Sequence, residues 1–315
     1  MAEQLLPDEI DFAAYERETD CKAKVRRASD FSDDVRAALK PRGNGGRGDP
    51  EMLSTKLRGV LAFRPGEVTC WAGYNGAKKS MFLGQVVLDL CSQQQRVLVA
   101  SMEMAPERTI ARMAQQCSGE RFPSGPWLEN FDRWTDGKLW LFDHVGRISP
   151  RMCMAVCRYF AEELNGTHIV IDSMMMVCAS EEHMDEQKQF VTDLVRIAQE
   201  TGMHIHLVAH CRKPQNGGGE EKPPSKYDVR GSAAIVDQCP NIILVWWNKP
   251  KHSKLEVDPH NADALAMPDY SVTVEKQRNG EWEGRVSLWF HKPSLRFMND
   301  RTSSVEPYVM VTSAA

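Results

Sequence analysis

The sequence has no long hydrophobic run and no excess of charge of either sign. No apolar stretch among its 315 residues approaches the roughly 18 residues that a membrane-spanning helix needs. Its 39 basic and 43 acidic residues give a formal net charge of −4, so nucleic-acid binding would have to come from a local patch. Residues 1–4 lack the features of a secretory or transit peptide. We therefore expect a cytoplasmic protein with no membrane partner.

The nine cysteines include no C-x-x-C pair. Most of them lie in apolar strand or helix patterns, so we expect reduced and buried thiols. Cys153 and Cys157 are four residues apart on a predicted helix, but no second pair of ligands accompanies them. Helix packing is therefore a better interpretation of this pair than a zinc site.

Residues 66–80 are the segment around which the chain is organised. Alternating apolar residues at 68–72 predict a strand, which is followed by a glycine turn and an apolar-periodic helix. This is the context of a phosphate-binding P-loop, and the pattern G-x-x-x-x-G-K-S is nearly met. Lys79 would reach the β- and γ-phosphates, the Ser80 hydroxyl would hold Mg²⁺, and backbone amides at the helix start would face the phosphates. The candidate nucleotide-binding residues are Gly73, Asn75, Gly76, Ala77, Lys78, Lys79 and Ser80.

One position departs from this pattern, because Lys78 stands where the second glycine is usual. Glycine is favoured there since the backbone approaches the phosphates closely in a conformation that a Cβ disfavours. A lysine either points its side chain outward at some cost or obstructs the site. Nucleotide binding with turnover, binding without turnover, and a chance glycine-rich turn all remain open on these residues alone.

The rest of the chain divides into an N-terminal arm, residues 1–50, and one large domain, residues 51–315. In the arm, residues 32–39 predict a short amphipathic helix and residues 42–50 a flexible linker. The domain alternates strands and helices, which predicts an α/β fold with a mostly parallel sheet covered by helices on both faces. Strands are expected at 67–72, 97–101, 138–142, 168–172, 203–209, 241–247, 270–276 and as a pair within 283–297. Helices are expected at 79–93, 106–117, 150–164, 185–201 and 232–238, and residues 213–226 are expected to form a mobile surface loop.

Polar residues follow three of the predicted strands, where each strand ends. Glu103 follows the strand at 97–101, Asp172 ends the strand at 168–172, and His210 follows the strand at 203–209. Carboxyl ends of parallel strands share one edge of a sheet, which is where such folds bind ligands. Asp172 could hold the water shell of Mg²⁺ and Glu103 could polarise an attacking water. Taken singly, a capping aspartate, a surface glutamate and a structural histidine are the alternatives, and the combination with the P-loop favours a site.

Six blocks of the sequence, in this order and spacing, resemble the RecA-like motor domain of DnaB-type hexameric replicative DNA helicases. The resemblance is closest to the bacteriophage primase-helicase and mitochondrial Twinkle branch, and it covers roughly residues 30–300. The blocks are the P-loop, Ser101-Met102-Glu103-Met104, His168 to Asp172, Val208-Ala209-His210, Asp228-Val229-Arg230-Gly231-Ser232 and Glu275-Lys276-Gln277-Arg278.

This resemblance implies a role for each matching residue. Glu103 corresponds to the catalytic glutamate, Asp172 to the metal-associated aspartate and His210 to a γ-phosphate sensor that couples to DNA. Lys276 and Arg278 correspond to a pair that reaches into the ATP site of the neighbouring subunit, with Arg278 as the arginine finger. Phe290 lies where family members place an aromatic ring against adenine, although a simple core phenylalanine is the alternative.

The resemblance also implies DNA-facing loops after two of the strands, at residues 174–188 and 211–227. Only the second loop is basic, and its candidate DNA-binding residues are Arg212, Lys213, Lys222 and Lys226. In a ring, six copies would contact phosphates without reading sequence, whereas a solvated lysine-bearing loop is the alternative. The helix at 32–39 and its linker match the segment that docks on the adjacent subunit. A homo-oligomer, with a hexameric ring as the expected form, is therefore implied twice.

These observations predict a ring-forming helicase that uses ATP, or another NTP, with Mg²⁺ to move along single-stranded DNA. The resemblance gives the direction as 5′ to 3′, a role in DNA replication, and a phage-infected or bacterial cell. The chain leaves no room for a primase module, so we expect a separate primase or polymerase as partner. A recombinase-like DNA-dependent ATPase and, because of Lys78, a hydrolysis-impaired nucleotide- or DNA-binding platform are the competing hypotheses.

Overall fold

The computed structural model describes residues 28–33, 36, 48–178, 184–213, 220–231 and 233–309. Near the N-terminus a 3₁₀ helix covers Ala28–Phe31. Most of the expected docking helix at 32–39, most of the linker, Ser232 and part of each expected DNA-facing loop lie outside the described residues.

A nine-stranded sheet forms the centre of the domain, in the order β3-β2-β4-β5-β1-β6-β7-β8-β9. The strands from β3 to β6 in this order are parallel, and β7, β8 and β9 add to one edge as antiparallel strands. Every residue of β1, β2, β4 and β5 is buried, as in parallel strands covered on both faces. The strands are β1 (Val68–Ala72), β2 (Val97–Ser101), β3 (Leu139–Leu141), β4 (His168–Asp172), β5 (His204–Val208), β6 (Asn241–Trp247), β7 (Tyr270–Gln277), β8 (Gly284–His291) and β9 (Arg296–Met298).

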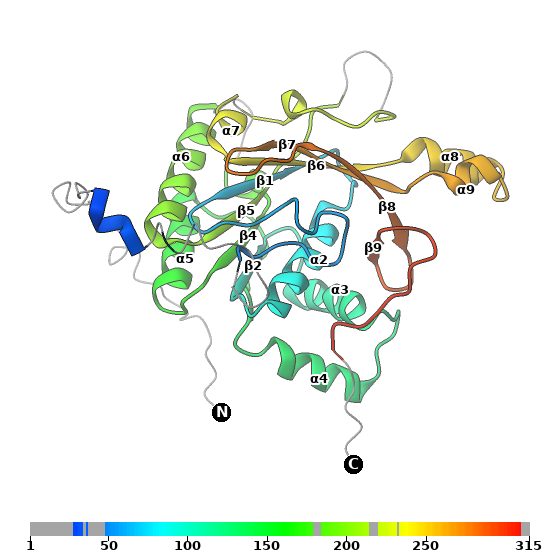
Figure 1. Ribbon diagram of the computed structural model, residues 1–315, viewed down its shortest axis with the longest axis horizontal. Helices are drawn as coiled ribbons and strands as arrows, with labels where there is room; N and C mark the ends of the chain where they lie inside the picture. Colours follow the sequence, from blue (N-terminus) through cyan, green and yellow to red (C-terminus); the bar gives the residue numbers. More distant parts are fainter. Residues whose placement is uncertain are drawn as a thin grey trace.

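Helices cover both faces of this sheet (Figure 1), so the predicted fold class is confirmed. On one face, α5 (Pro150–Glu162), α6 (Met184–Thr201) and α7 (Ala233–Gln238) bury an apolar layer that includes Phe160 and Phe190. On the other face, α2 (Lys79–Ser92), α3 (Pro106–Ser118) and α4 (Gly125–Thr135) pack through residues such as Phe82 and Met113. Alternate residues of each central strand point into one layer or the other, because side chains alternate along a strand.

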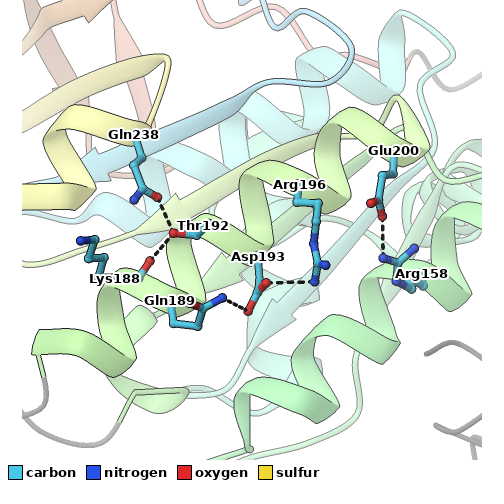
Figure 2. A network of polar contacts seen from close by, with 8 residues as sticks. All are labelled: Arg158, Lys188, Gln189, Thr192, Asp193, Arg196, Glu200 and Gln238. Atoms are coloured by element: carbon cyan, nitrogen blue, oxygen red, sulfur yellow. Dashed lines mark hydrogen bonds and ion pairs between the residues drawn. The ribbon is translucent and has the colours of Figure 1, made fainter. Parts of the chain in front are cut away.

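Polar contacts along α6 join the three helices of the first layer (Figure 2). Arg158 of α5 pairs with Glu200 of α6 at 2.6 Å, and the Thr192 hydroxyl of α6 lies 3.0 Å from the Gln238 side-chain oxygen at the end of α7. An ion pair this near the surface stabilises a fold only slightly. The value of these contacts is positional, because the ion pair fixes α5 and the hydrogen bond fixes the end of α7 relative to α6.

The sequence did not predict three helices that the structure contains: α4, α8 (Lys249–Val257) and α9 (Ala262–Ala266). The α8–α9 hairpin follows the carboxyl end of β6 and projects from the domain (Figure 1). Neither helix carries an apolar stripe, so periodicity gives no signal. The N-cap residues Asn248 and Asn261 could have indicated where these helices begin, because their side chains accept hydrogen bonds from the backbone amides of Lys251 and Ala264.

The expected burial of the cysteines is confirmed for the eight that the structure describes, all of which are free thiols in the interior. Cys153 and Cys157 both belong to the layer between α5 and the sheet. Within the described residues, no helix combines the length and the apolar character that a membrane span requires.

Candidate active site

The P-loop connects the end of β1 at Ala72 to the start of α2 at Lys79. A Cβ on Gly73 would lie 2.2 Å from the Val245 carbonyl oxygen of the adjacent strand, so this position excludes any side chain. The Lys79 ammonium is buried and lies 3.1 Å from the Gly73 oxygen and 3.2 Å from the Tyr74 oxygen. Burial lowers the pKa of Lys79, and the nearby Asp172 carboxylate opposes that effect. The loop thus holds a desolvated cation where the resemblance places the β- and γ-phosphates.

Lys78 adopts the left-handed conformation that a glycine would adopt without cost, with φ 58° and ψ 33°. Its carbonyl accepts a hydrogen bond from the Phe82 amide and so begins the helix. Its ammonium lies 3.9 Å from the centre of the Phe290 ring on β8. The side chain therefore leaves the P-loop toward the aromatic residue that the resemblance assigns to adenine. Asn75 and Gly76 are exposed, and Ala77 is buried.

The two predicted metal residues lie together. The exposed Ser80 lies in the first turn of α2 after Lys79, and it is near enough to the buried Asp172 at the end of β4 to act on the pKa of that carboxyl. Burial raises the pKa of Asp172, and the Ser80 hydroxyl and the charge of Lys79 lower it. Two hard oxygen ligands beside a phosphate-binding loop fit Mg²⁺, which usually keeps several waters and completes its shell with substrate phosphates.

Glu103 and His210 also meet at this edge. The Ser173 hydroxyl donates a 2.6 Å hydrogen bond to Glu103 Oε1, and His210 Nε2 lies 3.9 Å from the same oxygen. The contact with His210, reinforced by Ser173, lowers the pKa of Glu103 to about 2. His210 Nδ1 lies 3.3 Å from the Lys79 ammonium. The imidazole therefore bridges the cation of the P-loop and the ionised carboxylate.

Backbone hydrogen bonds hold His210 in this position. The Cys211 amide donates to the Gly73 carbonyl at 2.9 Å, and the Arg230 amide donates to the His210 carbonyl at 2.7 Å. A bridge between Cys211 and Val229 continues this pairing. The described part of the block at 228–232 thus lies against the end of β5. The basic loop at 211–227 begins and ends next to the P-loop.

Lys276 and Arg278 lie away from the P-loop of their own chain. Lys276 donates to the carbonyls of Val236 and Asp237 at the end of α7, and Arg278 donates to Asp237 at 3.2 Å. The Arg278 amide bonds the Pro240 carbonyl, before β6 begins, whereas the P-loop follows Ala72, which pairs with Leu244 of β6. Four strand residues span about 13 Å, so the pair is at the opposite edge of the sheet.

The candidate DNA-binding residues all lie in the described parts of their loop. Arg212, Lys213 and Lys222 are exposed, and Lys226 is partly exposed with its ammonium 5.7 Å from the Tyr227 ring centre. The first expected DNA-facing loop begins with a short 3₁₀ helix, Met174–Met176, in which Met174 is buried.

Sequence reasoning gave no role to Ser173 or Asp269, which orient the candidate residues. Ser173 directly follows Asp172, and its hydroxyl fixes Glu103. Asp269 pairs with the buried Lys251 at 2.7 Å and accepts the Phe290 amide at 2.9 Å. A polar residue immediately after a buried strand was the available signal for Ser173. No sequence pattern pointed to Asp269, because its partners lie 18 and 21 residues away.

Comparison with known proteins identifies the family. The family model described as "AAA domain" matches residues 49–216, more than half of the chain. The DNA helicase/primase of Enterobacteria phage T3 is 27% identical over 208 residues, covering 60% of this chain and 37% of that protein. The Twinkle homolog protein, chloroplastic/mitochondrial, of Arabidopsis thaliana is 22% identical over 215 residues, covering 62% of this chain and 30% of that protein. The chain thus spans about a third of the length of these relatives.

Two solved structures share the fold. One, described as an ATPase domain, has a TM-score of 0.62 at 18% identity, and the match covers 76% of this chain and 86% of that one. A DnaB-like replicative helicase, solved for its interactions with primase, has a TM-score of 0.67 at 16% identity and covers 87% of this chain and 67% of that one. These matches confirm the predicted resemblance to phage helicase-primases, Twinkle proteins and DnaB-like helicases. The chain belongs to the AAA domain family and resembles the motor domain of DnaB-like replicative helicases.

Proposed function

We propose that this chain is the motor of a DNA helicase that hydrolyses ATP, or another NTP, and moves 5′ to 3′ along single-stranded DNA in replication. The observation that carries the proposal is the linked set Lys79, His210, Glu103 and Ser173, in which a buried ammonium and an ionised carboxylate flank one imidazole. A purely structural P-loop would not need this set at the carboxyl edge of the sheet.

In this proposal each residue has a distinct task. Lys79 binds the β- and γ-phosphates, and Mg²⁺ held by Ser80 and Asp172 supplies charge neutralisation on the same phosphates. Glu103, whose pKa is about 2, stays ionised and orients the attacking water by accepting its hydrogen bond. Such a weak base does not take the proton fully, so positioning rather than proton removal is its contribution. Ser173 keeps the Glu103 carboxylate in place.

Coupling to DNA would run through His210. Its ring contacts Lys79, and the next residues, Cys211 and Arg212, begin the basic loop. The chain that returns from this loop donates the Arg230 amide to the His210 carbonyl. A change at the γ-phosphate that moves His210 therefore moves Arg212, Lys213, Lys222 and Lys226 with it. These cations would contact the phosphates of single-stranded DNA from each copy around a ring.

Arg278 would act in a neighbouring subunit. Arg278 lies at the end of the strands opposite its own P-loop, so it could reach a nucleotide there only if the sheet rearranged. A homo-oligomer, proposed as a hexameric ring, would bring it to the next subunit's nucleotide, where a trans arginine is worth roughly 10³ to 10⁵ in rate in other nucleotide hydrolases. The names of the relatives, a helicase/primase and a helicase studied with primase, support a replication setting with a primase partner in a phage-infected or bacterial cytoplasm.

A mixing experiment tests the shared site. ATP hydrolysis with single-stranded DNA would be measured for the protein, for Lys79→Ala, for Arg278→Ala and for an equimolar mixture of the two variants after subunit exchange. Each variant alone should lose at least about 100-fold in turnover, and the mixture should regain part of it, because some interfaces join an intact P-loop to an intact arginine. A mixture as inactive as its components, with the two variants shown to co-assemble, would contradict the trans role.

Lys78 supports a second candidate function, a hydrolysis-impaired platform that binds nucleotide and DNA. The reason is that a lysine occupies a P-loop position with a left-handed backbone, where glycine is usual. The two candidates differ in turnover. DNA-stimulated hydrolysis by the unaltered chain supports the motor, whereas hydrolysis that appears only in Lys78→Gly supports the platform.

A further inference from the structure

Among the described residues, two aromatic rings and one cation lie close to the Phe290 ring. Tyr270 and Phe297 pack against it with ring centres 5.7 and 5.2 Å away, and both belong to the buried core beside α2. The third neighbour is the Lys78 ammonium, 3.9 Å from the ring centre. The two aromatic rings thus hold Phe290 against the core. The flexible side chain of Lys78, from the P-loop, lies over its ring.

Phe290 also borders a hollow of about 520 Å³ between the α8–α9 hairpin and the end of β8. Its wall is polar and of mixed charge, with His252, Asp269, Lys292 and Arg301 among its residues. Asp269 fixes the ring by accepting the Phe290 amide. The ring therefore stands between the P-loop and a space of a size that admits a nucleobase with its sugar.

The Lys78 ammonium is not in a favourable electrostatic position. The cationic side chains of Lys292 and Arg112 act on it unfavourably, and the Asp269 carboxylate acts on it favourably. The side chain is half-buried and already contributes its charge beside the phosphate-binding loop. An incoming polyphosphate would draw the ammonium away from the ring, because it would bind beside the Lys78 backbone and bring more negative charge than the single Asp269 carboxylate.

We propose that Lys78 gates the base subsite: its ammonium and the nucleobase compete for the same ring of Phe290, so that a nucleotide must displace Lys78 before its base can stack. This rests on the proposed nucleotide-binding function and adds a specificity device to it. The gate weakens the binding of a complete nucleotide relative to a bare polyphosphate. The chain thereby requires a base that stacks well enough to replace a cation–π contact.

The test compares two ligands on the full chain without turnover. Dissociation constants for ADP and for inorganic tripolyphosphate would be measured by calorimetry for the unaltered protein and for Lys78→Gly, and their ratio taken. Loss of the lysine charge affects both ligands, so the ratio isolates the base. We expect Lys78→Gly to shift the ratio about three- to tenfold in favour of ADP. Glycine suits the φ of 58°, so the variant keeps the backbone.

Two controls separate the gate from general electrostatics. Lys254→Met removes an exposed lysine of α8 that neither lines the hollow nor touches the ring, and its ratio should stay that of the unaltered protein. In a Phe290→Leu background, Lys78→Gly should no longer shift the ratio. An unchanged ratio in Lys78→Gly, or one that shifts against ADP because Lys78 clamps the base, would overturn the gate while leaving nucleotide binding intact. Binding of neither ligand by any variant would instead overturn the proposed function itself.

Discussion

At the residue scale, the two glycines of the P-loop are required for different reasons. Gly73 has no room for a side chain, because a Cβ there would lie 2.2 Å from a backbone carbonyl oxygen. Gly76 has open space around it but takes a φ of +77°. Steric exclusion between backbones cannot be relieved by moving a flexible side chain, whereas a left-handed φ costs a non-glycine residue only about 1 kcal/mol.

The matched substitutions Gly73→Ala and Gly76→Ala should therefore differ in stability. We expect Gly73→Ala to lower the free energy of unfolding by about 3 kcal/mol or more, because β1 and β6 must separate locally. Gly76→Ala should cost about 1 kcal/mol. Urea unfolding followed by far-UV circular dichroism measures both. Equal costs for the two variants would show that the clash at Gly73 is relieved by movement of the loop.

At the scale of elements, the central strands carry a cluster of three buried histidines. His168 of β4 lies 3.3 Å from His206 of β5, and the Trp71 indole donates to the other nitrogen of His206. His204 Nδ1 lies 2.7 Å from the Arg64 carbonyl. Accepting the indole hydrogen requires His206 to be neutral, and its remaining N–H then donates to His168. The cluster therefore joins β1, β4 and β5 only in its uncharged form.

This cluster should make the fold sensitive to acid. Burial lowers the pKa of His204 to about 4 and those of His168 and His206 well below 6.5. The unfolded chain takes up these protons near pH 6.5 and the native state does not, so stability is full above that pH and falls as the pH drops toward 4. His204 alone should contribute a loss of about 2 kcal/mol between pH 7 and pH 5.

Urea unfolding at both pH values checks this expectation. His204→Gln should reduce the loss between pH 7 and pH 5 by about 2 kcal/mol, since glutamine cannot take the proton. Substitution of the exposed His260 by glutamine should leave the loss unchanged. A pH dependence equal in all three proteins would mean that the histidines are not the acid-sensitive groups.

A second element, α7, depends on Lys276. The Lys276 ammonium donates to two of the last carbonyls of this six-residue helix, and Arg278 adds a longer bond to one of them. Cations stabilise helix C-termini by satisfying free carbonyls and interacting with the helix dipole. Lys276→Met should lower the free energy of unfolding by about 1 to 2 kcal/mol, whereas Arg278→Ala should change it by less than about 0.5 kcal/mol. Thermal melts measure both. A large loss in Arg278→Ala would make its loss of activity uninformative about a trans role.

At the scale of the whole molecule, net charge opposes DNA binding and local charge would have to supply it. The chain carries −4 overall, and four cations of one loop are the proposed contacts. Lys213→Ala with Lys222→Ala should weaken the binding of single-stranded DNA for every sequence tested. It should also reduce the slope of log K against log salt by about 1.4, that is, about 0.7 for each lost contact. Titrations at several salt concentrations measure the slope, with the exposed Lys254→Ala as a control that should leave it unchanged.

The sequence by itself determined the fold class, the central strands, most of the helices that cover them and the residues at the carboxyl edge. Their signals are local: buried parallel strands read as apolar runs, and the P-loop, Glu103, Asp172 and His210 each follow a strand directly. Helices α8 and α9 were not predicted, because they bury few side chains and have no apolar stripe. Helix α4 buries Trp127 and Phe131 among charged neighbours, which hid its packing face.

Only the tertiary structure decided which side chains meet. The contacts of Lys78 with Phe290, of Ser173 with Glu103 and of Lys276 with the end of α7 join segments 40 to 212 residues apart. Such contacts depend on strand order and register, which no local pattern encodes. The direction taken by the Lys78 side chain is the sharpest case. Its residue type marked a departure from the P-loop pattern, and only the placement of β8 beside the loop showed what the ammonium touches.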